Sequence, residues 1–149
     1  MTTPVSESPI HPVQAAIYRL LGEDETLLDL APGGVHDEVP ETQVMPWIRI
    51  GDHLSIPDNA HGQFGRQITE TVHVWTRRRG NATGQAIAAR IGELLDHQAA
   101  ALQAAGADDL DGHVIVSVRQ EYDQALKDPD PQIRHHVLRF RIITAQQEG

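Results

Sequence analysis

Three consecutive arginines are the residues whose type and spacing most strongly suggest chemistry. They stand in the stretch HVWTRRRGNATGQ, directly before a glycine-bearing turn: Arg77, Arg78 and Arg79. Guanidinium groups bind phosphates and carboxylates alike. A phosphate-binding loop requires G-x-x-x-x-G-K-[ST], but Gly80 and Gly84 are too close together and Gln85 stands in place of the lysine. The pattern therefore favours a turn that starts a helix, capped by Asn81 or Thr83.

The arginines themselves leave three interpretations open. A solvated surface is the most ordinary one, and a contact with a carboxylate-bearing protein neighbour comes second. Nucleic acid comes last, because no aromatic residues are interleaved to stack bases. The formal net charge of −9 also disfavours general affinity for a polyanion.

Metal and catalytic chemistry find little support in the sequence. His135 and His136 are adjacent on an expected strand and point to opposite faces, so they do not readily share one ion. The acidic run DDLDG lacks the glycine position and the final acidic ligand of a calcium loop. No cysteine nucleophile or G-x-S-x-G motif is present. We therefore expect a binding or assembly module without catalytic residues, cofactor or metal.

Length and composition fit one globular domain. The chain has 149 residues, 40% of them hydrophobic, and we expect a single domain over residues 1–149 with flexible ends at 1–9 and 145–149. No stretch approaches the roughly 18 apolar residues of a membrane span, and MTTPVSESP lacks the basic region and apolar run of a secretion signal, so we expect none. We expect the protein to be made and kept in a cytoplasm, or in something assembled there, without contact with a membrane.

Hydrophobic periodicity predicts an α+β fold. HPVQAAIYRLLG, residues 11–22, has the spacing of an amphipathic helix, and a short helix follows in EDETLLDL. A short extended segment, GVHDEVP, comes next. One long helix is expected from about Ala82 to Ala105. Strands are expected over residues 42–54, 66–76, 111–126 and 133–144, the last two forming a closing hairpin at the DPDP turn. The result is a mostly antiparallel sheet with the N-terminal helix and the long central helix packed on one face.

Alternation along the strands assigns side chains to faces. Ile68, Glu70, Val72 and Val74 share one face of their strand, and Val114, Val116 and Val118 share one face of theirs. On the last strand Arg139 and Arg141 lie together, and a cross-strand ion pair with Glu121 or Asp123 is the ordinary explanation. The segment from His53 to Gly65 is too long for a tight hairpin and is either a flexible arm or an extended hairpin tip.

Several stretches, taken in order, resemble one protein family. VHDEVP, PWIRIG and VWTRRRG follow the N-terminal helix in that order, and the chain closes with VLRFRIIT. From about Pro9 to Thr144 the chain resembles the tail-terminator or tail-completion proteins of long-tailed, siphovirus-type bacteriophages and prophages. One departure is that RRRGNATG carries more arginine than the family pattern requires, so a role for these arginines is not inherited from the family.

The resemblance implies a structural virion protein without catalytic residues. It implies a hexameric ring at the head-proximal end of the tail tube, which halts tube polymerisation and offers the head-joining surface. The implied partners are further copies of the chain, the tail tube protein, a head-side connector or stopper protein and the tape measure protein. Genomic DNA would pass through the lumen without specific binding. The protein would reside in the tail or neck of the virion, assembled in the cytoplasm of the host bacterium.

A ring of this kind suggests interface residues, because its subunits associate head to tail through two different surfaces. The three arginines could meet the acidic segment Glu23, Asp24 and Glu25 of a neighbour. The segment that holds His53 and Phe64 is a candidate arm toward the tube or the head connector. The alternatives are another connector or tail-tube protein of the neck and, from a different class, a small ligand- or nucleic-acid-binding accessory domain.

Overall fold

The structure of the protein, a computed structural model, describes residues 3–60 and 63–147. Two helices open the chain, α1 (Ile10–Gly22) and α2 (Glu25–Leu30). Three strands follow, β1 (Val35–His36), β2 (Trp47–Pro57) and β3 (Gly65–Arg77). Helices α3 (Ala82–Leu95) and α4 (Ala99–Gly106) and the 3-10 turn η1 (Ala107–Leu110) lead to β4 (His113–Lys127) and β5 (Ile133–Gln146). The fold is α+β, as predicted.

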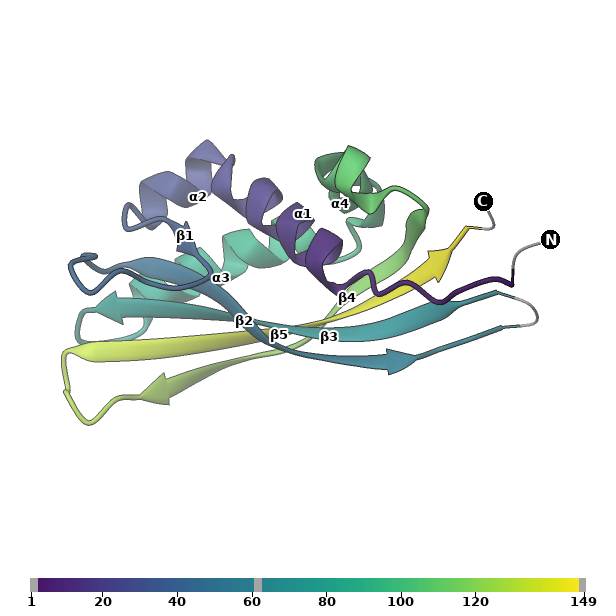
Figure 1. The fold of residues 1–149 in the computed structure, drawn as a ribbon. Coiled ribbons are helices and arrows are strands. Elements are labelled where there is room, and N and C mark those ends of the chain that lie inside the picture. Colours follow the sequence, from purple (N-terminus) through teal and green to yellow (C-terminus); the bar gives the residue numbers. More distant parts are fainter. Residues whose placement is uncertain (1–2, 61–62, 148–149) are drawn as a thin grey trace.

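The five strands form one sheet in the order β1-β2-β3-β5-β4. β1 pairs with β2 in parallel, and the other neighbours are antiparallel. All the helices lie on one side of this sheet, and the other side carries no further layer in the described part of the chain (Figure 1). The predicted mostly antiparallel sheet with helices on one face is therefore the observed architecture.

The core lies between the helices and the covered face of the sheet. Helix α1 contributes Val13, Ala16, Ile17 and Leu21, whose spacing places them on one face of the helix. From the sheet, alternate residues such as Val72, Leu138 and Phe140 point toward the helices and are fully or almost fully buried. The apolar residues at helical spacing and those that alternate along the strands are thus buried in a single core.

The predicted long helix is interrupted, which corrects the expectation of one helix from Ala82 to Ala105. Helix α3 ends at Leu95 and α4 begins at Ala99. At the break, His97 adopts a positive φ of 59°. The backbone N–H of His97 donates to the carbonyl oxygen of Val118, and the carboxylate of Asp96 accepts from the N–H of Gln120. These bonds to β4 hold the chain out of the helical path at the break, so the apolar stripe is divided between two helices.

Two strands depart from simple alternation. β2 begins at Trp47, and Val44 is exposed, because Pro46 has no N–H with which to extend the ladder. In β4 the register shifts between Ile115 and Ser117, so Ile115 and Val118 face the core and Val116 is exposed. The prediction that Val114, Val116 and Val118 share one face was therefore wrong, because a β-bulge inserts one residue.

The expected flexible ends lie partly outside the described residues, which exclude 1–2 and 148–149. Of the remainder, Ala145 and Gln146 belong to β5. The side chain of Gln146 accepts from the N–H of Glu7 and donates to the carbonyl oxygen of Val5. Residues 5–7 and the end of β5 lie side by side, next to the end of the β2–β3 hairpin (Figure 1).

Candidate assembly surfaces

The arginine turn is an exposed corner of the molecule. Arg77, Arg78 and Arg79 are all exposed, and Gly80 makes the predicted turn with a φ of 87°. Asn81 holds the N-cap position of α3, as expected. Its side chain makes no capping hydrogen bond with the helix backbone. Arg77 lies 3.5 Å from Asp130 of the β4–β5 turn, a weak surface ion pair.

The acidic segment before α2 is divided between two roles. The carboxylate of Asp24 accepts from the N–H of Leu27 and caps α2. Both of its oxygens also accept from Arg90 of α3, at 2.9 and 2.7 Å. The hydrogen bonds from Arg90 hold the pKa of Asp24 below its usual value. Asp24 therefore ties α2 to α3, whereas Glu23 and Glu25 are exposed.

The segment from His53 to Gly65 is a hairpin end, which is the second of the two predicted alternatives. β2 continues to Pro57, and its pairing with β3 reaches Arg66. His53 is exposed and its Nδ1 lies 2.9 Å from Nε2 of Gln14. Phe64 is half-buried, and its carbonyl oxygen accepts from the N–H of Gln146. Residues 61–62 of this segment lie outside the described residues.

Gln14 also contacts a carboxyl group that sequence reasoning did not single out. Its Nε2 donates to Oε1 of Glu70 at 3.0 Å, and Glu70 is fully buried. Oε2 of Glu70 has no hydrogen-bond partner in the described part of the chain. Burial raises the pKa of Glu70 to about 7. The signal was present in the sequence, because alternation places Glu70 between Ile68 and Val72 on the core face.

The uncovered side of the sheet, here called the open face, is defined by rows of paired residues. Residues paired directly across strands point to the same side of a sheet. The rows on the side away from the helices are Trp47, Trp75, His135 and Leu126; Arg49, His73, Val137 and Gln124; Gly51, Thr71, Arg139 and Tyr122; Leu54, Thr69, Arg141 and Arg119; and Ile56, Gln67, Ile143 and Ser117.

A stacked cluster of rings occupies one half of the open face. The ring of His135 lies parallel to that of Trp75 with centroids 3.9 Å apart, and its Nε2 lies 2.8 Å from Nδ1 of His73. Nε2 of His73 lies 2.9 Å from Oδ2 of Asp52. Asp52 has a φ of 58° at the bulge in β2, and this bulge turns its carboxylate toward the open face. Burial lowers the pKa of His135 to about 4, so this ring is neutral at pH 7. The sequence showed no signal for this cluster.

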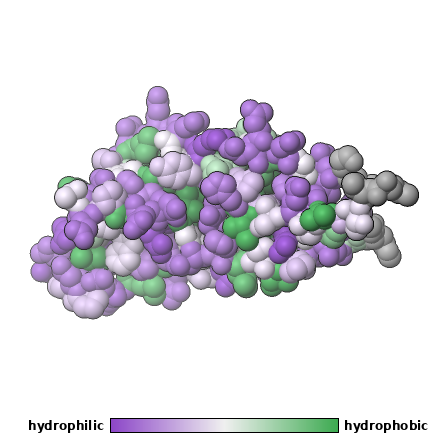
Figure 2. Space-filling model, in the orientation of Figure 1, coloured by the Kyte–Doolittle hydropathy of each residue, from purple (hydrophilic) through white to green (hydrophobic). Residues whose placement is uncertain are grey.

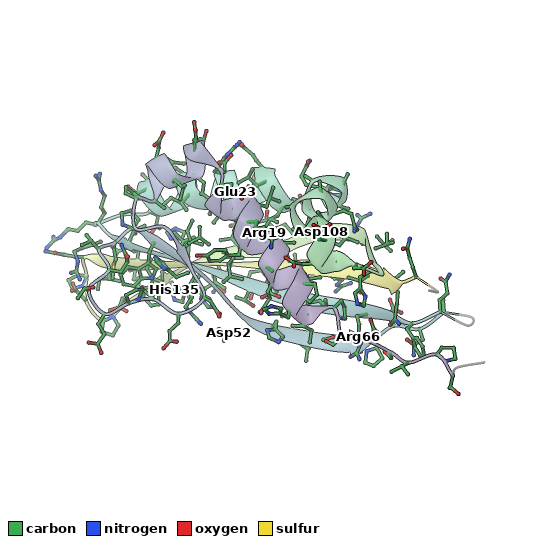
Figure 3. The ribbon with its side chains drawn as sticks, turned by 45° about the horizontal axis from the view of Figure 1, so that its top comes forward. Arg19, Glu23, Asp52, Arg66, Asp108 and His135 are labelled. Carbon is green, nitrogen blue, oxygen red and sulfur yellow. The ribbon has the colours of Figure 1, made fainter. Side chains whose placement is uncertain are left out.

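The predicted cross-strand ion pair is present on the other half of the open face. Glu121 accepts from Nε of Arg139 at 3.1 Å and from Nη2 of Arg141 at 2.9 Å. His135 and His136 lie on opposite faces as expected, His136 being buried beneath α3. Figure 3 shows Asp52 and His135 on the strands, and Arg19 on α1, Glu23 in the turn after it and Asp108 on η1.

Neither the surface hollows nor the side-chain clusters of the described residues indicate a ligand or metal site. The largest of the hollows described for the chain has a volume of about 520 Å³ and lies where α4 meets β4, between Ala100 and Val114. Within residues 3–60 and 63–147, no group of three or more His, Asp or Glu side chains is placed to hold a metal ion. None of the helices in the described residues has the length and apolar character needed to cross a membrane.

Comparisons with known proteins agree on the kind of particle. Residues 15–145 match the family described as tail completion protein gp17. A solved chain from a structure described as the virion of a native gene transfer agent particle has the same fold. The TM-score is 0.78 at 20% sequence identity, and the match covers 94% of this chain and 99% of the other. No curated protein matches the sequence. Because the family match covers most of the chain, this protein belongs to the tail completion protein gp17 family and is a structural component of a phage-type virion tail.

Proposed function

We propose that this protein forms a ring of six identical subunits at the head-proximal end of the tail tube. There it stops tube polymerisation and offers the surface on which the DNA-filled head docks. The observation that supports this function is the family match over residues 15–145. In this role the protein is an assembly component, not an enzyme.

The arginine turn supports a contact between neighbouring subunits. Arg78 and Arg79 are exposed and make no ion pair with the described residues. Glu23 and Glu25 are exposed carboxylates, whereas Asp24 already binds Arg90 within the chain. A ring subunit presents two different surfaces, so that opposite charges on one copy and the next favour closure. In our proposal the turn of one subunit meets Glu23 and Glu25 of the next.

The end of the β2–β3 hairpin supports a contact with the tail tube or the head-side connector. The two strands are paired as far as Pro57 and Arg66. Binding a partner here therefore costs little conformational entropy, because the backbone is already ordered. Leu54 and Ile56 on β2 are 55% and 46% exposed, and they lie between His53 and the hairpin end. Exposed apolar residues of this size are suited to a protein partner. The tape measure protein is a further partner in this proposal.

The position of the protein in the particle tests this proposal. A small affinity tag at the N-terminus, which is not part of the proposed contacts, is decorated with gold in complete particles. We expect the gold at the junction of head and tail in particles that still assemble and join. Gold at the distal tip or along the tube contradicts a terminator and assigns the protein to another part of the tail. An untagged particle is the matched control.

A further inference from the structure

The open face of the sheet has the composition of a protein interface. It carries both tryptophans of the chain, one of its two tyrosines and four arginines. Trp, Tyr and Arg are enriched at the centres of interfaces. Tyr122 and Leu126 on this face are 42% and 38% exposed. Hydrophobic residues also lie along the lower border of the space-filling view (Figure 2), where Figure 1 draws the strands.

The two sides of the subunit carry charges of opposite sign. On the open face Arg49, Arg119, Arg139 and Arg141 outnumber Asp52 and Glu121. Arg119 lies opposite Arg141 and makes no ion pair with the described residues. The helical layer, residues 10–34 and 82–112, carries nine acidic residues and only two basic ones, Arg19 and Arg90. The helical layer is thus strongly acidic and the open face is basic.

The helical layer also exposes small side chains over which a neighbouring sheet can pack. Ala86 and Ala89 of α3 and Ala100 and Ala104 of α4 are exposed, so few long side chains stand between the helix backbones and a neighbour. The exposed carboxylates of Glu23 and Asp108 lie on this same side of the molecule (Figure 3). Guanidinium groups on an opposing sheet could bind these carboxylates, and the aromatic residues could pack over the alanines.

We propose that the open face of one subunit docks on the helical layer of the next, and that this contact closes the ring. The docking rests on the ring proposed above and names its interface. Each subunit gives a different side to each neighbour, as a heterologous contact requires, and a fixed rotation between copies closes it. The arginine turn and Glu23 with Glu25 lie at the margin of this interface.

Charge also argues against the open face as the wall of the DNA channel. Arginines on a channel wall would hold the phosphates of DNA, because each contact releases counterions. A channel that DNA must leave freely is better lined by other surfaces. Docking on an acidic neighbour neutralises the open face instead.

The absence of cysteine from the chain allows a direct test by cross-linking. One cysteine is placed on the open face, by Thr71→Cys or Gln124→Cys, and one on the helical layer, by Ala89→Cys or Ala100→Cys. These four side chains are exposed or half-buried and none makes a side-chain hydrogen bond or ion pair with the described residues. Tails carrying each of the four double variants are treated with a flexible bismaleimide and separated under denaturing conditions. The single variants and A89C/A100C are the matched controls.

We expect at least one open-face and helical-layer pair to give a ladder of covalent oligomers, and the single variants to stay monomeric. Dimers from T71C or Q124C alone would show open faces against each other and would overturn the proposal. Rings visible by electron microscopy with no ladder in any pair would also overturn it, and would place the open face on the channel or against another virion protein. Absence of rings would contradict the proposed function itself, so the two failures are distinguishable.

Discussion

Glu70 gives a quantitative prediction, because a fully buried carboxyl group must respond to pH. Its folded-state pKa is raised by burial from 4.5 to about 7, and only Oε1 accepts a hydrogen bond from the described residues. The folded protein therefore binds the proton more tightly than the unfolded chain does. Protonated Glu70 stabilises the fold fully below pH 4.5, and this stabilisation is lost as the pH rises toward 7.

The size of the effect follows from the difference between the two pKa values. Each unit of pKa difference corresponds to about 1.4 kcal/mol, so the free energy of unfolding falls by up to about 3 kcal/mol between pH 4.5 and 7. Above pH 7 the contribution of this group becomes constant. Glu70→Gln keeps the shape and the oxygen that accepts from Gln14, but it removes the titration.

We expect the Gln variant to be about as stable as the wild type near pH 5 and more stable by up to about 3 kcal/mol near pH 8. Urea unfolding followed by the fluorescence of Trp47 and Trp75 at several pH values measures this difference. The difference between the two proteins cancels the contributions of all the other titrating groups. Glu25→Gln makes the same chemical change at an exposed site and serves as the control.

Parallel stability curves for the wild type and Glu70→Gln would refute this reasoning. They would mean that Glu70 titrates alike in the folded and unfolded states. A variant that is less stable at every pH would show that the fold needs the charge of Glu70. This result would contradict the argument that ionised Glu70 destabilises the folded protein.

Three further predictions concern other named contacts. Asp24→Ala removes the cap of α2 and the partner of Arg90, and urea unfolding should show a loss of about 2 kcal/mol, against less than about 0.5 kcal/mol for Glu25→Ala. Gly84→Ala places a Cβ against the buried ring of His136, so we expect a loss of about 1–3 kcal/mol; Gly22→Ala, which meets nothing within 4 Å, should not destabilise, and equal effects would contradict the packing argument. Replacing Arg77, Arg78 and Arg79 by Glu should leave the melting temperature nearly unchanged but abolish ring assembly, as seen by electron microscopy, whereas intact rings would remove the turn from the interface.

The local elements of the fold were predictable because their hydrophobic periods are regular. The residues of α1 and the alternation in β3 follow from spacing alone, and so does a cross-strand ion pair of Arg139 and Arg141, although spacing did not choose Glu121 over Asp123. The break after Leu95 was not predictable, because it depends on hydrogen bonds between Asp96, His97 and the distant strand β4. The bulge after Ile115 is hidden for a similar reason, since it is defined only by the pairing with β5.

The candidate surfaces were predictable only in part. The exposed arginine turn could be located, because charge and a glycine turn are local features. The stack of Trp75, His135 and His73 joins two strands that are about 60 residues apart, and nothing in either strand indicates the other. The open face as a whole emerges only once the strand order β1-β2-β3-β5-β4 is known, because β5 inserts between β3 and β4.

The measurement that tests the central claim most directly is electron microscopy of a lysate in which the gene for this protein is disrupted. A terminator predicts filled heads without tails, beside unjoined tubes of irregular and excessive length, and recovery of normal particles when the wild-type chain is supplied. Heads joined to tails of normal length in the disrupted strain would contradict the account.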